Sequence, residues 1–181
     1  GIKIGMLPNK ESVEIVASFI EGISCTNVIL DPVLTTSLGE SLCTEEGIDS
    51  LKEILFPLVT LITPNLNEAN SLTDESYSDF EDFPKLAEKC LSYGTEAVLI
   101  KGGHLNDIKR CKDYLLFKDK NYKSFDHPRI VSGSEVRGTG CRLASAITCK
   151  FVSINSLTTA VGEAIDFVGS YISRKATKSI C

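Results

Sequence analysis

The stretch "LVTLITPNLNEA", residues 58–69, contains a strand-to-helix junction. Its first half, residues 58–63, is a short apolar run of the kind that forms a buried strand. Its second half places Asn65 and Glu68 three residues apart, the spacing of a helix N-cap and its capping-box partner. The stretch therefore predicts a β-strand that ends near Pro64 and a helix that follows it directly.

The same alternation of apolar runs and helical periodicity extends in both directions along the chain. Strands are expected at residues 2–7, 27–30, 58–63 and 97–100, with intervening helices over residues 13–23, 44–55 and 83–91. The first of these helices is expected to bury Val13, Val16, Phe19, Ile20 and Ile23. Because strands that alternate with helices pair in parallel, the pattern predicts a three-layer α/β/α fold with a mainly parallel sheet.

The second half of the chain departs from this alternation. Residues 115–117 and 122–125 form two short candidate strands separated by charged turn residues, which indicates a hairpin at the edge of the sheet. Two helices are expected to close the chain, one from about Cys141 and one over residues 157–172. No linker, repeat or shift in composition divides the sequence, so a single domain over residues 1–181 is expected.

Composition and charge exclude several classes of protein. The chain has 181 residues, 43% of them hydrophobic, and a net charge of -5. A nucleic-acid binder needs clustered Lys and Arg, and a membrane span needs about 20 apolar residues, so we expect no nucleic-acid partner and no membrane segment. The seven cysteines form no Cys-x-x-Cys pair, which favours reduced thiols and a cytoplasmic protein.

Polar residues follow the predicted parallel strands. Asp31 follows the second strand, Asn65 and Glu68 follow the third, and Lys101 follows the fourth. In open parallel sheets, ligands bind outside the carboxyl ends of the strands. These four residues are therefore expected to converge on one polar rim.

Each of these residues also has a purely structural interpretation. The Asp31–Pro32 dipeptide is by itself more typical of a turn. Asn65 and Glu68 fit a capping box, although Glu68 is also suited to ordering magnesium-bound water. Lys101, before two glycines, is either a solvated charge at a tight turn or a cation near phosphate. The spacing leaves both interpretations open.

The histidines and the remaining acidic residues carry a weaker signal. His104 and His127 are too isolated in the sequence to indicate a metal site or a catalytic triad, and His104 is considered only as a pocket-lining residue. Asp113 and Asp126 are interpreted as surface charges.

The segment Gly138, Thr139, Gly140 and Cys141 stands directly before a periodic apolar stretch. Glycines let a loop wrap an anion, and the amides at a helix start attract phosphate. Cys141 at that positive terminus is expected to have a depressed pKa, which suits a base or an anion-stabilising group. The alternative is a small buried cysteine that packs under the helix.

Taken together, "KIGML", "DPVLTTSLGESL", "LFPLVTLITPNLNEANSL", "AVLIKGGHL" and "RGTGCRLASAI" resemble, in order and spacing, the hydroxymethylpyrimidine and phosphomethylpyrimidine kinases of thiamine biosynthesis. These enzymes belong to the ribokinase-like superfamily. The resemblance covers nearly the whole chain. It implies transfer of the ATP γ-phosphoryl group to hydroxymethylpyrimidine or its monophosphate, with Mg²⁺ as the cation.

The resemblance also implies roles for individual residues. The loop Gly138, Thr139 and Gly140 matches the anion hole for the transferring phosphoryl group, and Cys141 stands at the position of the catalytic base. The other matched positions are Asp31, Asn65 and Lys101 near the nucleotide phosphates, Glu68 in the magnesium motif, and Met6 beside the pyrimidine. Arg137 and Arg142 depart from the family pattern and add positive charge beside the anion hole.

The sequence begins at the family's "KIGM" strand, with Gly1, so the family's N-terminal segment is expected to be supplied separately or to be absent. This predicts Mg-ATP binding with weak kinase activity, and self-association through an exposed sheet edge. Two alternatives remain at this stage: a pyridoxal or thiazole kinase of the same branch, and a non-catalytic nucleotide-binding remnant or partner subunit.

Overall fold

The computed structural model describes residues 1–36, 38–103, 109–130 and 136–178. Along the chain the elements are β1 (Ile2–Ile4), α1 (Lys10–Glu21), β2 (Val28–Leu30), α2 (Glu45–Ser50), a π-helical turn (Leu51–Leu55), a 3-10 turn (Phe56–Leu58), β3 (Leu61–Ile62), α3 (Leu66–Thr73), a 3-10 turn (Phe80–Asp82), α4 (Phe83–Leu91), β4 (Ala97–Ile100), β5 (Arg110–Phe117), β6 (Tyr122–Pro128), α5 (Thr139–Ile154) and α6 (Leu157–Lys178). The predicted α/β alternation is confirmed.

The described strands form a six-stranded sheet in the order β1-β2-β3-β4-β5-β6. The first four strands pair in parallel, whereas β5 is antiparallel to both β4 and β6. The hairpin lies at the sheet edge, as predicted, but its strands are longer than expected and make the sheet mixed. Strand β3 is shorter than the predicted 58–63 because Pro57 lies in a 3-10 turn that occupies its beginning.

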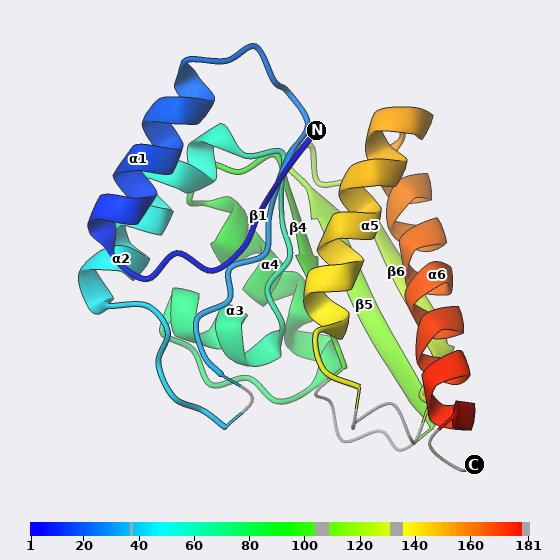
Figure 1. Cartoon of the computed structure of the whole chain (residues 1–181). Helices are drawn as coiled ribbons and strands as arrows, with labels where there is room; N and C mark the ends of the chain where they lie inside the picture. Colours follow the sequence, from blue (N-terminus) through cyan, green and yellow to red (C-terminus); the bar gives the residue numbers. More distant parts are fainter. Residues whose placement is uncertain (37, 104–108, 131–135, 179–181) are drawn as a thin grey trace.

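Helices cover both faces of this sheet (Figure 1). One core cluster joins the side chains of α1, α3 and α4 to Val28 and Leu30, whereas a second joins α5 and α6 to Ile29. Successive residues of a strand point to opposite faces, so the continuous apolar run of β2 supplies both clusters. The predicted three-layer arrangement is therefore confirmed.

The buried face of α1 is narrower than predicted. Val13, Ala17 and Ile20 are buried, but Phe19 is 60% exposed. The placement of Phe19 on the buried face was wrong because a residue next to Ile20 lies about 100° around the helix from it. Ile23 lies beyond the end of α1.

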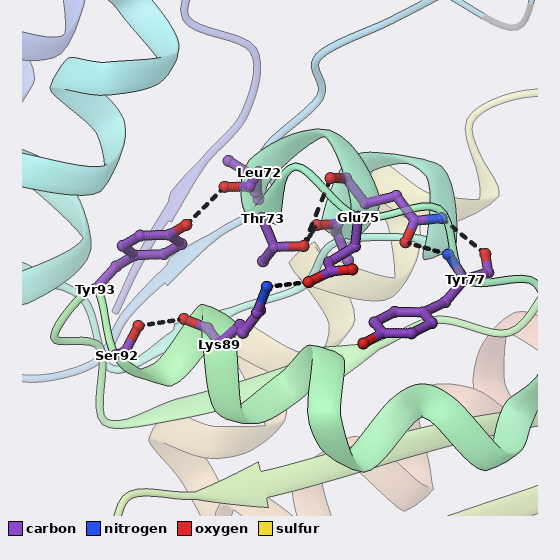
Figure 2. A network of polar contacts seen from close by, with 9 residues as sticks. Leu72, Thr73, Glu75, Tyr77, Lys89, Ser92 and Tyr93 are labelled. Carbon is purple, nitrogen blue, oxygen red and sulfur yellow. Dashed lines mark hydrogen bonds and ion pairs between the residues drawn. The ribbon is translucent and has the colours of Figure 1, made fainter.

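Helix α3, which begins at the site described below, is held against α4 by a network of polar contacts (Figure 2). Lys89 of α4 forms an ion pair with Glu75. The hydroxyl of Tyr93 donates to the carbonyl oxygen of Leu72 at 2.8 Å. The amide side chain of Asn70 donates to the carbonyl oxygen of Tyr77 and accepts from its backbone N–H. These contacts fix the C-terminal end of α3 and therefore its direction from β3.

Candidate functional site

A cavity of about 620 Å³ lies at the carboxyl ends of β2, β3 and β4. The predicted site residues that line it are Asp31, Asn65, Glu68, Lys101, Gly138, Thr139, Gly140 and Cys141. They come from three strand ends and from the start of α5. The structure thus brings together eight residues that are widely separated in the sequence.

Asp31 and Lys101 form the centre of this group. Asp31 is 1% exposed, and its Oδ1 accepts hydrogen bonds from Lys101 Nζ at 2.8 Å and from Thr63 Oγ1 at 3.1 Å. Lys101 Nζ also lies 4.0 Å from Glu68 Oε2. Lys101 is therefore not a solvated charge. The Asp31 carboxylate lies in the site, so Asp31 is more than part of an Asp-Pro turn.

Asn65 and Glu68 form the capping box that their spacing predicted. Asn65 Oδ1 accepts from the Glu68 backbone N–H at 2.9 Å, and Glu68 Oε2 accepts from the Asn65 backbone N–H at 2.7 Å. Burial raises the pKa of the Glu68 carboxyl, and this effect outweighs the opposing influence of the Lys101 ammonium and the Asn65 N–H. The cap and the position in the cavity are compatible, because the cap itself holds Glu68 next to Lys101.

The start of α5 contributes Gly138, Thr139 and Gly140 to the lining of the cavity. Gly138 is the N-cap, with φ of 74°, and no side chain caps this helix. The helix starts at Thr139, two residues earlier than predicted, so its uncapped first turn includes Gly140 and Cys141. A Cβ atom on Gly140 would lie 3.2 Å from Lys101 Nζ, which shows how closely the loop approaches the lysine.

Cys141 differs from both expectations for it. Its side chain is exposed to solvent, so the interpretation as a cysteine packed under the helix was wrong. Partial burial raises the pKa of its thiol, and the neighbouring Asp31 carboxylate raises it further, so the expected depression was also wrong. Each of the nearby cations, Lys3 and Lys101, lowers this pKa by less than burial raises it.

Three other predicted positions lie apart from the cavity or outside the described residues. Met6 follows β1, is 47% exposed and does not line the cavity. Arg142 does not face the cavity either: its Nη1 donates to the carbonyl oxygens of Arg137 and Gly138 at 3.3 and 3.4 Å, and its guanidinium lies 4.2 Å from the ring centroid of Tyr171. His104 lies outside the described residues.

The hairpin contributes residues to the cavity that the sequence analysis missed. Cys111, Asp113 and His127 all line it. Asp113 is only 5% exposed, so its assignment as a surface charge was wrong. Asp126 does lie near the surface, where it pairs with Arg110. The available signal was the alternation along residues 111–115, which places Cys111, Asp113 and the buried Leu115 on one face of β5.

The fold is that of the ribokinase-like small-molecule kinases. The chain is similar to the pyridoxal kinase of Staphylococcus aureus in complex with AMP-PCP, with a TM-score of 0.83 and 28% identity over 94% of this chain and 61% of that one. It is also similar to the phosphomethylpyrimidine kinase of Clostridium difficile 630, with a TM-score of 0.78 and 28% identity over 94% of this chain and 68% of that one.

The chain belongs to the phosphomethylpyrimidine kinase family, which it matches over residues 1–179. It is 39% identical over 168 residues to the hydroxymethylpyrimidine/phosphomethylpyrimidine kinase of Aquifex aeolicus (strain VF5). This match covers 93% of the chain but 65% of the relative, so the chain spans slightly less than two thirds of that protein's length. Among the described residues, no helix combines the length and apolar character that a bilayer crossing requires.

Proposed function

We propose that the chain takes part in the ATP-dependent phosphorylation of hydroxymethylpyrimidine, its monophosphate, or both, in thiamine biosynthesis. The observation that carries this proposal is the convergence of Lys101 with the uncapped start of α5 in one cavity. A cation and a row of backbone N–H groups together form a site for a polyphosphate. Membership of the phosphomethylpyrimidine kinase family supports a pyrimidine as the acceptor.

In this proposal the loop from Gly138 to Gly140 holds the transferring phosphoryl group, and Lys101 neutralises its developing charge. Asp31 keeps Lys101 extended into the cavity, and Asn65 lies beside the nucleotide phosphates. The bond between the γ-phosphorus and the β,γ-bridging oxygen breaks as the acceptor oxygen bonds to the phosphorus. Catalysis then comes mainly from positioning and charge neutralisation.

Cys141 is the proposed catalytic base for the hydroxymethyl acceptor. Its thiolate takes the hydroxyl proton as the oxygen attacks the γ-phosphorus. Because the pKa of the thiol is raised above its ordinary value, the thiolate becomes abundant only as the pH rises into the alkaline range. Turnover of the hydroxymethyl substrate is therefore expected to increase with pH.

The donor set fits Mg²⁺ that enters on the nucleotide phosphates. Mg²⁺ keeps several waters and takes one or two carboxylates, and the cavity offers Asp31 and Glu68. Glu68 accepts the capping hydrogen bond from Asn65 through Oε2. We propose that its carboxylate also orients water bound to the metal. When bound, the cation neutralises phosphate charge. Among the described residues, no group of three or more His, Cys, Asp or Glu side chains forms a separate metal site.

The remaining assignments also stay proposals. Met6 is proposed to lie beside the pyrimidine, and residues 1–181 are proposed to act as a single domain. A cytoplasmic location is favoured by the free thiols of the six described cysteines. The net charge of -5 favours a small-molecule partner over nucleic acid. A homo-oligomer or a separate N-terminal segment is proposed as a further partner.

The test is the substitution Cys141→Ala. We expect turnover of hydroxymethylpyrimidine to fall by about 100-fold or more, the usual contribution of a general base. The dissociation constant for Mg-ATP should change little, because backbone amides and Lys101 hold the phosphates. The wild-type rate should rise with pH, and the variant should lack this rise. Calorimetry measures the affinity and a coupled ADP-release assay the turnover, first with the chain alone and then with the family's N-terminal segment in trans.

Turnover by Cys141→Ala equal to that of the wild type would contradict the assignment of the base. Absence of Mg-ATP binding by the wild-type chain would contradict the nucleotide site itself. Cys149→Ala is the matched control, because Cys149 is also an exposed cysteine of α5 but does not line the cavity.

A second acceptor is favoured by the likeness to the Staphylococcus aureus pyridoxal kinase. The same cavity would then transfer the γ-phosphoryl group to the hydroxymethyl group of pyridoxal. Competition between pyridoxal and hydroxymethylpyrimidine in the same assay decides which acceptor is preferred.

A further inference from the structure

Asp113 is a nearly buried carboxylate that joins two parts of the cavity wall. Its Oδ1 accepts a hydrogen bond from the backbone N–H of Gly102 at 2.8 Å. Its Oδ2 lies 3.2 Å from Nε2 of His127, on the neighbouring strand β6. The side chain of Asp113 is 7% exposed and that of His127 is 32% exposed. The carboxylate thus connects the hairpin to the residue that follows Lys101.

The Gly102 amide belongs to the segment that directs Lys101 into the cavity. The backbone N–H of Lys101 donates to the carbonyl oxygen of Pro64 at 2.9 Å, so the residue is held on its β3 side. The Asp113 carboxylate holds the following peptide from the β5 side. Lys101 Nζ then reaches Asp31 at 2.8 Å. The backbone around Lys101 is therefore anchored on two sides, and Asp113 provides one of the anchors.

The two anchors differ in chemistry. The Pro64 anchor is a backbone hydrogen bond, whereas the Asp113 anchor has a titratable partner, His127. The hydrogen bond to Asp113 raises the pKa of His127 above its ordinary value, and the effect exceeds the opposing cost of burial. The Asp113 charge, the Pro128 carbonyl and the charge of Asp126 raise it further. The charge of protonated His127 therefore balances the Asp113 carboxylate, and the pair acquires a net negative charge when the imidazolium loses its proton.

Other groups face this pair across the cavity and from its neighbours. On β5, Cys111 is the register partner of His127 and also lines the cavity. The cavity is also lined by Asp31, Glu68, Lys101 and Cys141, whereas α6 contributes the apolar side chains of Val168 and Ile172. Burial moves the pKa of Cys141 upward, away from the range in which His127 titrates.

We propose that the Asp113–His127 pair is a proton-dependent positioning device for phosphate binding. Protonated His127 holds the Asp113 carboxylate against the Gly102 amide, which positions Lys101 in the cavity. It also balances the negative charge of Asp113, so this carboxylate adds no net negative charge to the cavity wall. Deprotonation loosens this anchor and leaves a negative charge on the cavity wall, and both effects weaken the binding of a nucleoside polyphosphate. The inference rests on the proposed function in that the cavity binds nucleotide phosphates.

The first experiment measures the dissociation constant of Mg-ADP from pH 5.5 to pH 8.5, for the wild-type chain and for His127→Gln. The ratio of the two constants cancels the ionisation of the nucleotide itself. At low pH the variant should bind about three- to tenfold more weakly, which corresponds to a shift of half a unit to one unit in the pKa of His127 on binding. The ratio should approach one as the pH rises above that pKa.

Two further variants sharpen this measurement. His127→Lys keeps a positive charge at position 127 from pH 5.5 to pH 8.5. The affinity of this variant for Mg-ADP should therefore not fall with rising pH as the affinity of the wild-type chain does. Asp126→Asn is the matched control, because Asp126 is adjacent in sequence but pairs with the exposed Arg110. It should keep the pH dependence, with its midpoint moved to lower pH because the Asp126 charge no longer raises the pKa of His127. A constant wild-type to His127→Gln ratio across the whole range would overturn the proposal.

The second experiment does not depend on nucleotide. In the free chain, the NMR chemical shift of the Gly102 amide should titrate with the same midpoint as the His127 ring, and this titration should disappear in His127→Gln. A Gly102 amide that is insensitive to the His127 titration would overturn the positioning role. If the wild-type chain binds no Mg-ADP at any pH, the proposed function fails, and the Gly102 titration still decides whether the anchor exists.

Discussion

The parallel strands and the hairpin each supply a buried carboxylate to the same cavity, but they neutralise it differently. Asp31, at the end of β2, pairs with the ammonium group of Lys101 at 2.8 Å. Asp113, in the middle of β5, pairs with the imidazole of His127, whose pKa this pairing raises. The difference is that a lysine balances one carboxylate, whereas a group that titrates near neutral pH balances the other.

The largest effect that tests this comparison is expected from Lys101→Met. The substitution leaves the Asp31 carboxylate buried, 1% exposed and without its cation, which costs about 3–5 kcal/mol of unfolding free energy. Urea denaturation measures this loss. The control is Lys118→Met, because Lys118 pairs with Glu96 at 3.0 Å but both side chains are about 60% exposed. That pair should contribute about 0–1 kcal/mol. Similar small losses in both variants would remove the distinction between the buried and the exposed pair.

A smaller, pH-dependent effect is expected from His127→Gln. The folded-state pKa of His127 lies above its unfolded value, so its contribution to stability is fully present below the unfolded pKa of about 6.5. The contribution is lost as the pH rises through the folded-state pKa. We therefore expect the variant to lose about 1 kcal/mol at pH 5.5 and progressively less at higher pH. A loss that does not change between pH 5.5 and pH 9, in urea titrations at each pH, would show that the pair contributes no charge-dependent stability.

The smallest effect on stability is expected from Glu68→Gln. Glutamine also serves in a capping box, so the unfolding free energy should change by no more than about 0.5 kcal/mol. Magnesium-dependent nucleotide use should nevertheless weaken, because an amide replaces the carboxylate in the cavity. Nucleotide affinity measured over a magnesium titration separates the two roles. Unchanged magnesium dependence with normal activity would leave only the capping role for Glu68.

The parallel half of the fold and its site residues could be predicted because they depend on local patterns. Short apolar runs followed by polar residues identify strand ends, and topology alone then brings Asp31, Glu68 and Lys101 to one edge. The capping box of Asn65 and Glu68 could be predicted for the same reason, because both partners lie within one helical turn.

The hairpin residues could not be predicted in this way. Asp113 lies within a strand, where the alternation along residues 111–115 shows which side chains share a face but not whether that face is buried. Its two partners are 11 and 14 residues away in the sequence. Whether such a carboxylate is a surface charge or a buried anchor depends on which face of β5 turns toward α6 and the cavity. That choice follows from how the hairpin joins β4, not from the residues next to Asp113.

The sequence by itself determined the alternation of strands and helices, the family, and the loop that begins α5, because each of these depends on neighbouring residues. The tertiary structure alone decided the electrostatic state of the site. Cys141 was expected to have a lowered pKa from its place at a helix start, yet burial and the Asp31 carboxylate raise it. His127 carried no signal in the chain until β5 placed Asp113 against it. A pKa is set by every charge and by the solvent around a group, and these surroundings come from distant segments that only folding brings together.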